Sequence, residues 1–361
     1  MTRVSGAALA RAVAVVALAL APLFVSATGD VLHNMVLAAA YVVMALGLNI
    51  IVGFAGLLDL GYVAFYALGA MVVGWWASGF FTGAGAGGEG IHVGVSGFAG
   101  TLPGIHVHFL VLVLGAIVVC ALAGAMIGLP TLRLRGDYIA VVTLAFGEII
   151  GRVFANGDEV TLLGEYRLTS GHRSISPIDA VDLPLLEPFD AAIDLRPYYW
   201  TIFAVVLVAL YVNIHLRDSR VGRAWIALRQ DEPAAACAGV PVTRTKLLAY
   251  ATGAAMGGVA GAFFASYRGV VNPAEFEFSF SIFILAMVAL GGLGSISGVV
   301  VGAIALSALN NYLLPDVLFD LPSKVGLAFD LSAVSSGIYG AILVAVMLLR
   351  PDGLVPARRT V

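Results

Sequence analysis

Long apolar stretches with almost no charge follow one another along the whole chain. A helix crosses the roughly 30 Å hydrocarbon core of a bilayer with about 20 residues, and these stretches reach or approach that length. A transmembrane barrel would instead show strands of about ten residues with alternating polarity. We therefore predict an all-α, polytopic transmembrane helical bundle of about ten spans. Their approximate limits are 8–27, 32–52, 60–78, 107–129, 138–155, 198–216, 246–267, 280–295, 297–314 and 332–349.

The composition excludes a soluble domain. Hydrophobic residues make up 60% of the 361-residue chain and charged residues only 11%, so there are too few polar side chains to cover a soluble surface. The two cysteines, Cys120 and Cys237, lie in a span and in a loop, and we expect no disulfide between them. We treat 1–361 as a single transmembrane domain.

Basic residues are distributed unevenly between the two sets of loops. With the N-terminus inside, 13 of the 19 lysines and arginines fall in inner segments, five fall in outer segments, and Arg152 lies within a span. The positive-inside rule then predicts that both termini are cytoplasmic, that 217–245 is a cytoplasmic loop and that 156–197 is an extracytoplasmic loop. The apolar run that ends at Ala27 also resembles a secretory signal peptide, but we expect a retained first helix.

The sequence lacks recognisable catalytic and metal-binding motifs. A phosphate-binding loop needs a Gly-Lys-Ser/Thr run, and neither Lys246 nor Lys324 stands in one. No histidine begins a His-Glu-x-x-His motif, and we expect His106 and His108, at an outer helix edge, to be a solvated pair. We therefore expect no catalytic residue, metal ion or cofactor in this chain, and no nucleic-acid partner.

The predicted cytoplasmic loop contains two short helical segments. Residues 219–229 have apolar side chains at helical spacing and arginines between them, which is typical of an amphipathic helix. Asp231 is suited to cap a second, shorter helix, and Gly239 is suited to end it. A helix of two turns does not hold together alone in water. It therefore packs on lipid headgroups or docks into a cytoplasmic partner.

Four stretches carry a resemblance to a known family. They are "GLNIIVGFAGLLDLGYVAFYALGA" (47–70), "LRLRGDYIAVVTLAFGEIIGRV" (132–153), "LRDSRVGRAWIALRQDEPAAACAGVPVTRTKLLAYATGAAMGGVAGAFFAS" (216–266) and "MVALGGLGSISGVVVGA" (287–303). They resemble the LivM family, the membrane permease subunits of ABC importers for branched-chain amino acids. The resemblance covers nearly all the spans in order. It implies a permease in a bacterial inner membrane that translocates leucine, isoleucine and valine.

The resemblance also implies the partners. Such a permease pairs with a second membrane subunit, two cytoplasmic ATPase subunits that bind ATP and Mg²⁺, and a periplasmic solute-binding protein. The cytoplasmic loop becomes the coupling loop, with candidate contact residues Arg223, Asp231, Glu232, Ala234, Ala235 and Gly239. The chain departs from the family pattern at two places. Pro233 stands where the loop's glutamate is expected, and 168–174 reads LTSGHRS where a glycine-rich LTGG run is usual.

Charged and polar residues within the apolar stretches are candidates for a substrate pathway. Glu148 and Arg152 stand four apart with the glutamate first, which favours an ion pair, and the cost of charge in a membrane places that pair on the bundle interior. Asp59 lies among glycines that indicate a broken helix beside a cavity, although its position also fits the cytoplasmic surface. The pathway candidates, which alternatively serve only structure, are Asn49, Asp59, Tyr62, Tyr66, Glu148 and Arg152.

Glycines recur every four residues in the span that follows the coupling loop. Gly253, Gly257 and Gly261 give that helix a face without side chains, which another helix can approach closely. The face then either transmits movement from the loop or packs statically. The pattern alone does not separate these two roles.

Three classes of function are compared for a polytopic membrane protein of this kind. The preferred one is the permease subunit of an ATP-driven importer for branched-chain amino acids, or alternatively for another small amino acid, amide or urea-like solute. The second is a self-sufficient secondary transporter in which Asp59 or Glu148 binds a proton or sodium ion. The third, an intramembrane enzyme, has no recognisable set of catalytic residues. A docking loop at 217–245 favours the importer, because a secondary transporter needs no ATPase.

Overall fold

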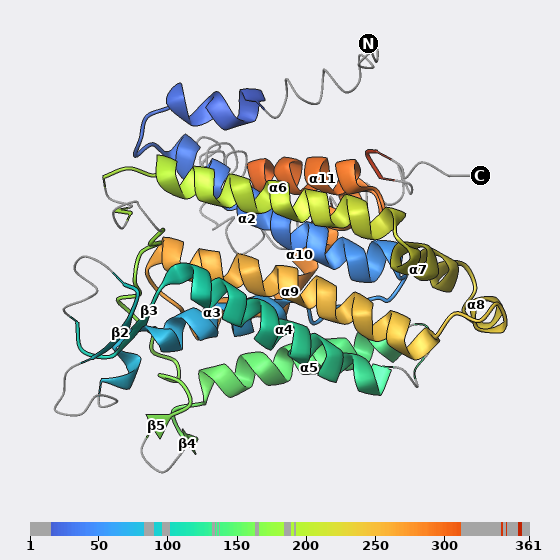
Figure 1. Cartoon of the computed structure of the whole chain (residues 1–361), viewed down its shortest axis with the longest axis horizontal. Helices are drawn as coiled ribbons and strands as arrows, with labels where there is room; N and C mark the ends of the chain where they lie inside the picture. The colour runs from blue at the N-terminus through green and yellow to red at the C-terminus, as the bar shows by residue number, and fades with distance from the viewer. Residues whose placement is uncertain are drawn as a thin grey trace, which may run out of the picture.

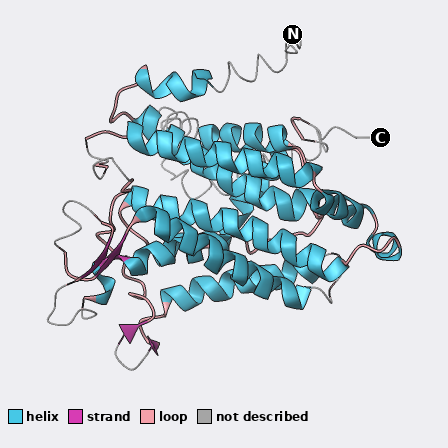
Figure 2. Cartoon of the chain, in the orientation of Figure 1, coloured by secondary structure: helices cyan, strands magenta, loops and turns pink. Residues whose placement is uncertain are grey.

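The structure is a bundle of helices that run roughly side by side (Figure 1). The computed structural model describes residues 16–82, 90–95, 102–131, 134, 136, 138–162, 166–183, 189–190, 193–311, 341, 344 and 353–355. Short strands gather at one end of the bundle and two short helices, α7 and α8, at the other (Figures 1 and 2). We call these the strand end and the α8 end.

Among the described residues, five helical segments are long and apolar enough to cross a membrane, which agrees with the predicted helical transmembrane protein. In the first, α2 continues directly into the π-helical turn η2, and the two together form the segment Asp30–Phe54. The elements are α2 (Asp30–Leu48), η2 (Asn49–Phe54), α4 (Phe109–Thr131), α5 (Tyr138–Ala155), α6 (Arg196–Asp218) and α9 (Val242–Arg268).

Three further apolar helices are shorter than a bilayer crossing. At 1.5 Å per residue, 13 or 14 residues span only about 20 Å. They are α3 (Val63–Trp76), α10 (Phe278–Gly291) and α11 (Ile296–Ala308). Eight of the predicted spans therefore coincide with described helices. Of the span near 8–27 only the part from residue 16 on is described, and nearly all of 332–349 lies outside the described residues.

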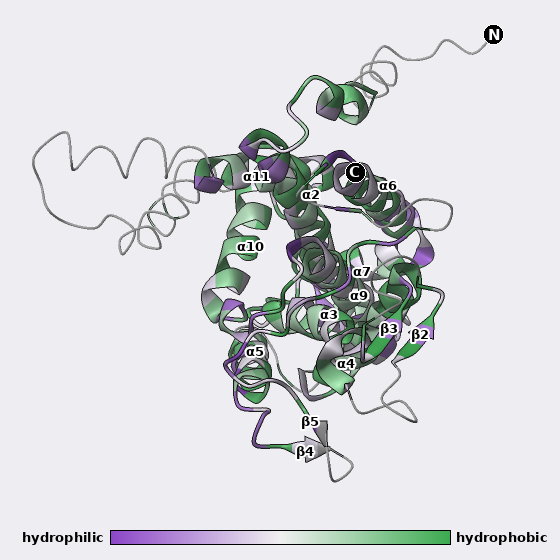
Figure 3. Ribbon diagram, turned by 90° about the vertical axis from the view of Figure 1, so that its left-hand side faces the viewer, coloured by the Kyte–Doolittle hydropathy of each residue, from purple (hydrophilic) through white to green (hydrophobic). Residues whose placement is uncertain are grey.

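Helix α9 lies in the middle of the bundle. It packs against α2, α3 and α4, and Figure 3, seen from the strand end, shows α3 and α9 surrounded by α4, α5, α6, α10 and α11. Small residues make this packing possible. Gly258 of α9, for example, lies against Cys120 of α4, whose Sγ donates to the carbonyl oxygen of Phe65 at 3.4 Å.

The strand end adds a small amount of β-structure that the all-α prediction did not contain. One sheet has the order β1-β3-β2, with β1 antiparallel and β2 parallel to β3, and β4 pairs with β5 in an antiparallel hairpin. Bridges join Ser78 to Ile178 and Ile175 to Val271, so the described part of 156–197 is tied to the ends of α3 and α9. The strands are β1 (Ala77–Ser78), β2 (Ile91–Val93), β3 (Ile105–Val107), β4 (Thr161–Leu162) and β5 (Tyr166–Arg167).

Short 3-10 turns complete the connections on the strand side of the bundle. The carbonyl oxygens of Pro22 and Val25 accept hydrogen bonds from the guanidinium of Arg196, which holds the segment before α2 against the start of α6. These turns are η1 (Ala21–Leu23), η3 (Gly79–Phe81) and η5 (Pro273–Glu275).

The two short helices predicted in the 217–245 loop are confirmed as α7 (Arg220–Gln230) and α8 (Glu232–Cys237). Ser219 caps α7 by accepting from the Gly222 amide at 3.1 Å, and Asp231 caps α8 by accepting from the Ala234 amide at 2.9 Å. Trp225 is fully buried and its indole donates to the carbonyl oxygen of Thr245 at 2.8 Å. Tertiary contacts therefore supply the support that α7 lacks alone.

Candidate functional site

The predicted helix break around the glycines at 53–61 is present. Helix α2 changes to the π-helical turn η2 at Asn49, and the chain then runs without regular structure through Gly56, whose φ is +71°, before α3 begins. Single π-helical turns inside longer helices are often found at functional sites. The break therefore marks the first part of the candidate site.

Asn49 connects this break to the turn between α10 and α11. Its Oδ1 accepts from the amide of Gly294 at 2.9 Å, and among the described residues its Nδ2 has no hydrogen-bond partner. A Cβ placed on Gly53 would lie 2.0 Å from that Oδ1 and 2.6 Å from the Gly294 nitrogen. Only glycine at 53 leaves room for this connection.

Asp59 is buried inside the protein, because only 2% of it is exposed. Its Oδ1 accepts from the Gly61 amide at 2.9 Å, and the neighbouring Leu60 amide donates to Oγ1 of Thr143 on α5 at 3.0 Å. Oδ2 of Asp59 has no hydrogen-bond partner in the described part of the chain. The loop after η2 is thus fastened to α5.

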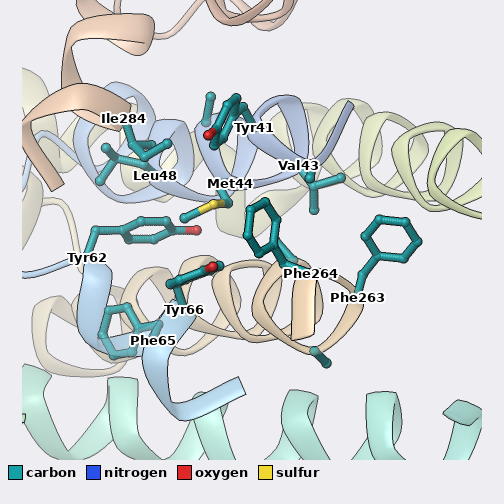
Figure 4. Close-up of a cluster of buried hydrophobic side chains, with 14 of the residues drawn as sticks. Tyr41, Val43, Met44, Leu48, Tyr62, Phe65, Tyr66, Phe263, Phe264 and Ile284 are labelled. Atoms are coloured by element: carbon teal, nitrogen blue, oxygen red, sulfur yellow. The ribbon is translucent and has the colours of Figure 1, made fainter. Parts of the chain in front are cut away.

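Tyr62 and Tyr66 are buried in helix contacts between α2 and α9 (Figure 4). The Tyr62 hydroxyl donates to the carbonyl oxygen of Gly253 at 3.0 Å. The Tyr66 ring packs against Phe264 and Phe280, with ring centroids 5.7 and 5.1 Å away. The structure brings Asn49, Asp59, Tyr62 and Tyr66 into one region, and their role in a pathway stays a prediction.

Glu148 and Arg152 are near each other, but the expectation that they face the interior of this bundle is wrong. Arg152 Nε lies 3.8 Å from Glu148 Oε2. The Arg152 side chain is 81% exposed and the Glu148 side chain is 44% exposed. Helix α5 turns a different face inward, because Gly147 lies against Gly61 and Gly151 against the Phe276 carbonyl. The pair is therefore available to water, to lipid headgroups or to another subunit.

The three glycines at four-residue intervals lie where α9 meets its neighbours. A Cβ on Gly261 would come within 2.1 Å of the Tyr66 carbonyl oxygen, and one on Gly253 within 2.8 Å of the Gly47 carbonyl oxygen. At Gly257 the nearest atom would be the Cβ of Phe65, at 3.1 Å. The backbones of α2, α3 and α9 approach closely at these points, and transmission of movement through them stays a prediction.

Some of the predicted coupling residues make contacts within their own chain, and others are exposed to a partner. Asp231 and Glu232 serve their own chain, since Asp231 caps α8 and the Glu232 carboxylate binds Nζ of the buried Lys246 at 2.8 Å. Arg223 donates to the Asp218 carbonyl oxygen at 2.9 Å. The exposed residues that α8 and its end offer to a partner are Pro233, Ala234, Ala236, Cys237, Ala238 and Gly239.

Ala235 requires a correction. It is only 5% exposed, so its methyl group packs against its own chain and not against a docking partner. Helical spacing explains the result, because a helix of six residues that lies on the protein must turn at least one side chain inward. Ala234, which precedes Ala235 in the sequence, is exposed and can contact a partner.

Arg229 was missed in the sequence and is held by several contacts. Its Nη1 donates to the carbonyl oxygen of Gly53. A Cβ added to Gly56 would lie 2.7 Å from the Arg229 Cγ, and a Cβ added to Gly294 would lie 2.9 Å from the Arg229 Nη1. A cavity of about 200 Å³ lies beside it. Its spacing of four from the buried Trp225 is the signal that brings it to these contacts, and the residue as a whole remains exposed.

The strand end contains a second buried polar pair. Nδ1 of His106 lies 2.7 Å from Oδ2 of Asp179, and the histidine side chain is fully buried. The expectation of a solvated pair is therefore wrong for His106. Burial raises the pKa of Asp179, and its hydrogen bond with His106 acts in the opposite direction. No local pattern predicts this contact, because the two residues are 73 positions apart.

Comparisons with known proteins give one consistent result. Residues 31–347 match the family model for the permease component of the branched-chain amino acid transport system. The chain is 34% identical to the high-affinity branched-chain amino acid transport system permease protein LivM of Escherichia coli K12 over 345 residues, which cover 88% of this chain and 68% of that protein.

More distant relatives carry related descriptions. The probable branched-chain amino acid transport permease protein LivM of Methanocaldococcus jannaschii is 23% identical, with 88% of this chain and 91% of that protein covered. The permease protein LivH of Escherichia coli K12 is 31% identical over 207 residues, which cover 53% of this chain and 64% of that protein. No solved structure matches the chain.

Proposed function

Since the chain belongs to the family of branched-chain amino acid transport permeases, we propose that it is one of two membrane subunits in an ATP-driven importer for leucine, isoleucine and valine. The second membrane subunit is of the LivH type, which is itself similar to this chain. A soluble binding protein delivers the amino acid from outside, and two cytoplasmic ATPase subunits bind ATP with Mg²⁺ and drive the cycle. The host membrane is the bacterial inner membrane.

The observation that carries this proposal is α8. It is a capped helix of six residues at one end of the bundle, and it exposes small side chains with no bulky group among them. So short a helix is held in place only by what it packs on, and a surface of alanines allows an opposing groove to come close. These properties suit a helix that docks into an ATPase subunit.

The arrangement of the two ends supports an orientation with both termini in the cytoplasm and ten spans. The Leu195 amide donates to the Ala27 carbonyl oxygen at the strand end, while the Leu354 amide donates to the Leu290 carbonyl oxygen on the side of the α10–α11 turn. If the α8 end faces the cytoplasm, the strand end faces the periplasm. The 156–197 loop, with three basic and eight acidic residues, then meets the binding protein.

The cycle follows from alternating access. ATP binding brings the two ATPase subunits together, the α8 helices of the two membrane subunits move with them, and the path between these subunits opens to one side at a time. The exposed Glu148–Arg152 pair lies on a face that a second subunit or an aqueous path has to cover, since exposure of charge to lipid is costly. The helix break after η2 contributes to this path, and it is held in position by four buried residues, Asn49, Asp59, Tyr62 and Tyr66.

The docking test compares bulky substitutions on two exposed positions. Ala234→Trp places a large ring on the exposed face of α8 and should hold the ATPase away, while Ile226→Trp adds the same ring to exposed α7 and serves as the control. We expect Ala234→Trp to insert normally, to lose co-purification with the ATPase subunits and to lose binding-protein-dependent uptake. Ile226→Trp should keep both.

Substrate choice is measured in the same preparation with a panel of labelled amino acids. Uptake of leucine, isoleucine and valine that needs both the binding protein and ATP supports the assignment. Assembly and transport that survive Ala234→Trp contradict docking through α8. Uptake in the absence of any ATPase contradicts the importer itself.

A further inference from the structure

Arg229 lies where the coupling loop, the break after α2 and the α10–α11 turn meet. The carbonyl oxygen of Gly53 accepts from its guanidinium, its aliphatic stem lies over Gly56, and its guanidinium lies over Gly294. We call Gly53, Gly56 and Gly294 the glycine cradle. We propose that Arg229, seated in this cradle, is the positioning residue that transmits displacement of α8 to the membrane helices.

The link from α8 to Arg229 is short and rigid. The Asp231 amide donates to the Ala227 carbonyl oxygen and completes α7, while the Asp231 side chain caps α8. A single residue thus ends one helix and starts the next, with no flexible linker between them. A push on α8 therefore moves the last turn of α7, which carries Arg229.

The link from Arg229 into the membrane region is equally direct. Gly53 belongs to η2, and the Asn49 side chain of the same turn holds the Gly294 amide at 2.9 Å. Gly294 has φ +84°, a left-handed conformation that favours glycine, and it precedes the cap of α11. Displacement of the Gly53 carbonyl therefore reaches the end of α2 and the turn between α10 and α11 together.

A second contact keeps α8 attached while Arg229 moves. The Glu232 carboxylate binds the buried Lys246 at the start of α9, so α8 is held at two points, on α9 and through Arg229 on the cradle. The cavity of about 200 Å³ between them is lined by Leu57, Leu58 and Ile139 as well as by these charged residues. It gives the side chain of Arg229 space to shift without first displacing a packed neighbour.

Arginine suits this task better than a neutral side chain of similar length. Its guanidinium stays charged and donates in several directions, so it can hold a backbone carbonyl while its stem packs on Gly56. Methionine would fill the cradle without the hydrogen bond. Lysine would keep the charge and could still donate to the Gly53 carbonyl oxygen, but would lose the planar group over Gly294.

The inference rests on the proposed function, and its test has a readout that does not depend on the substrate. The assembled transporter in proteoliposomes carries one accessible cysteine, Leu58→Cys, in a Cys237→Ser background; Cys120 is buried. Leu58 lines the cavity and is 36% exposed, so its labelling rate reports on the loop after η2. The rate is measured with and without a non-hydrolysable ATP analogue, alongside uptake per ATP hydrolysed.

We expect nucleotide to change the labelling rate at position 58 in the parent protein and in Arg220→Ala, an exposed residue on the same helix that serves as the control. Arg229→Met should abolish this change and lower uptake per ATP by about tenfold, the equivalent of one charged hydrogen bond. Arg229→Lys should retain part of both. Intact co-purification of the ATPase subunits separates this result from loss of docking.

Two results overturn the proposal. One is a nucleotide-dependent change at position 58 that persists in Arg229→Met with unaltered uptake per ATP. The other is the absence of any nucleotide-dependent change in the parent protein, because α8 would then move without reaching the loop. A parent protein that shows the labelling change but takes up no branched-chain amino acid contradicts the proposed function and leaves the role of Arg229 standing.

Discussion

Helices α9 and α4 are both long enough to cross a membrane, yet they occupy opposite environments. In α9 67% of the membrane-length segment is buried inside the protein, and in α4 only 28% is, although α4 is the more hydrophobic of the two. In a water-soluble protein the order would be reversed. Between these two helices, burial follows the share of small side chains and not hydrophobicity.

The physical reason is that lipid tails solvate leucine as well as a protein core does. Burial is then decided by close packing and by backbone approach, which small residues permit. Helix α4 shows both behaviours, since Gly124 lies against Ala254 of α9 while Leu114 and Leu122 on its other side are 63% and 62% exposed. One helix thus presents a small-residue face to the protein and a large-residue face outward.

The largest effect is expected where a side chain is added inside α9. Gly261→Ala places a Cβ about 2.1 Å from the Tyr66 carbonyl oxygen, so α3 and α9 have to separate, at a cost of about 1–3 kcal/mol. Gly115→Ala in α4 is the matched control, because its nearest neighbour is Val72 Cγ1 at 3.8 Å. Thermal unfolding in detergent measures both.

Alanine forms helices more readily than glycine, which increases the expected difference between Gly261→Ala and Gly115→Ala. Replacing glycine within a helix gains up to about 1 kcal/mol of helix propensity, so Gly115→Ala should melt at the same temperature as the parent or higher. Equal melting temperatures for the two variants would show that the close approach of α3 and α9 contributes nothing to stability.

The same comparison explains which parts of the fold could be predicted from the sequence. The apolar stretches identified the described helices, the amphipathic pattern of 219–229 identified α7, and the cap at Asp231 identified α8, because these signals are local. The glycines at four-residue intervals in α9 also indicated close backbone approach. Local patterns sufficed wherever one helix decides its own conformation.

Contacts between distant segments were not predictable in the same way. Glu148 and Arg152 were expected inside because charge avoids lipid, but the sequence does not tell a protein interior from a face that another subunit covers. Arg229 binds a backbone carbonyl 176 residues away. Every residue has a backbone carbonyl, so the sequence does not indicate which one an arginine binds. The strands at the strand end have only two or three residues, too few for an alternating pattern.

A smaller effect is expected from a buried hydrogen bond between α3 and α9. Tyr62→Phe removes the hydroxyl that donates to the Gly253 carbonyl oxygen and should cost about 0.6 kcal/mol, the average for such bonds in a membrane protein. Tyr138→Phe, on the exposed side of α5, is the control and should be neutral. A loss above about 2 kcal/mol would mean that the hydroxyl does more than join two helices.

The smallest effect is expected on the outer face of α4. Leu122 is 62% exposed, and if lipid or detergent surrounds it, Leu122→Ala exchanges one apolar contact for another and should change stability by less than about 0.5 kcal/mol. The same substitution should leave co-purification with the second membrane subunit unchanged. Loss of that subunit would show that α4 forms the interface, and its low burial would then reflect an uncovered protein surface and not a preference for lipid.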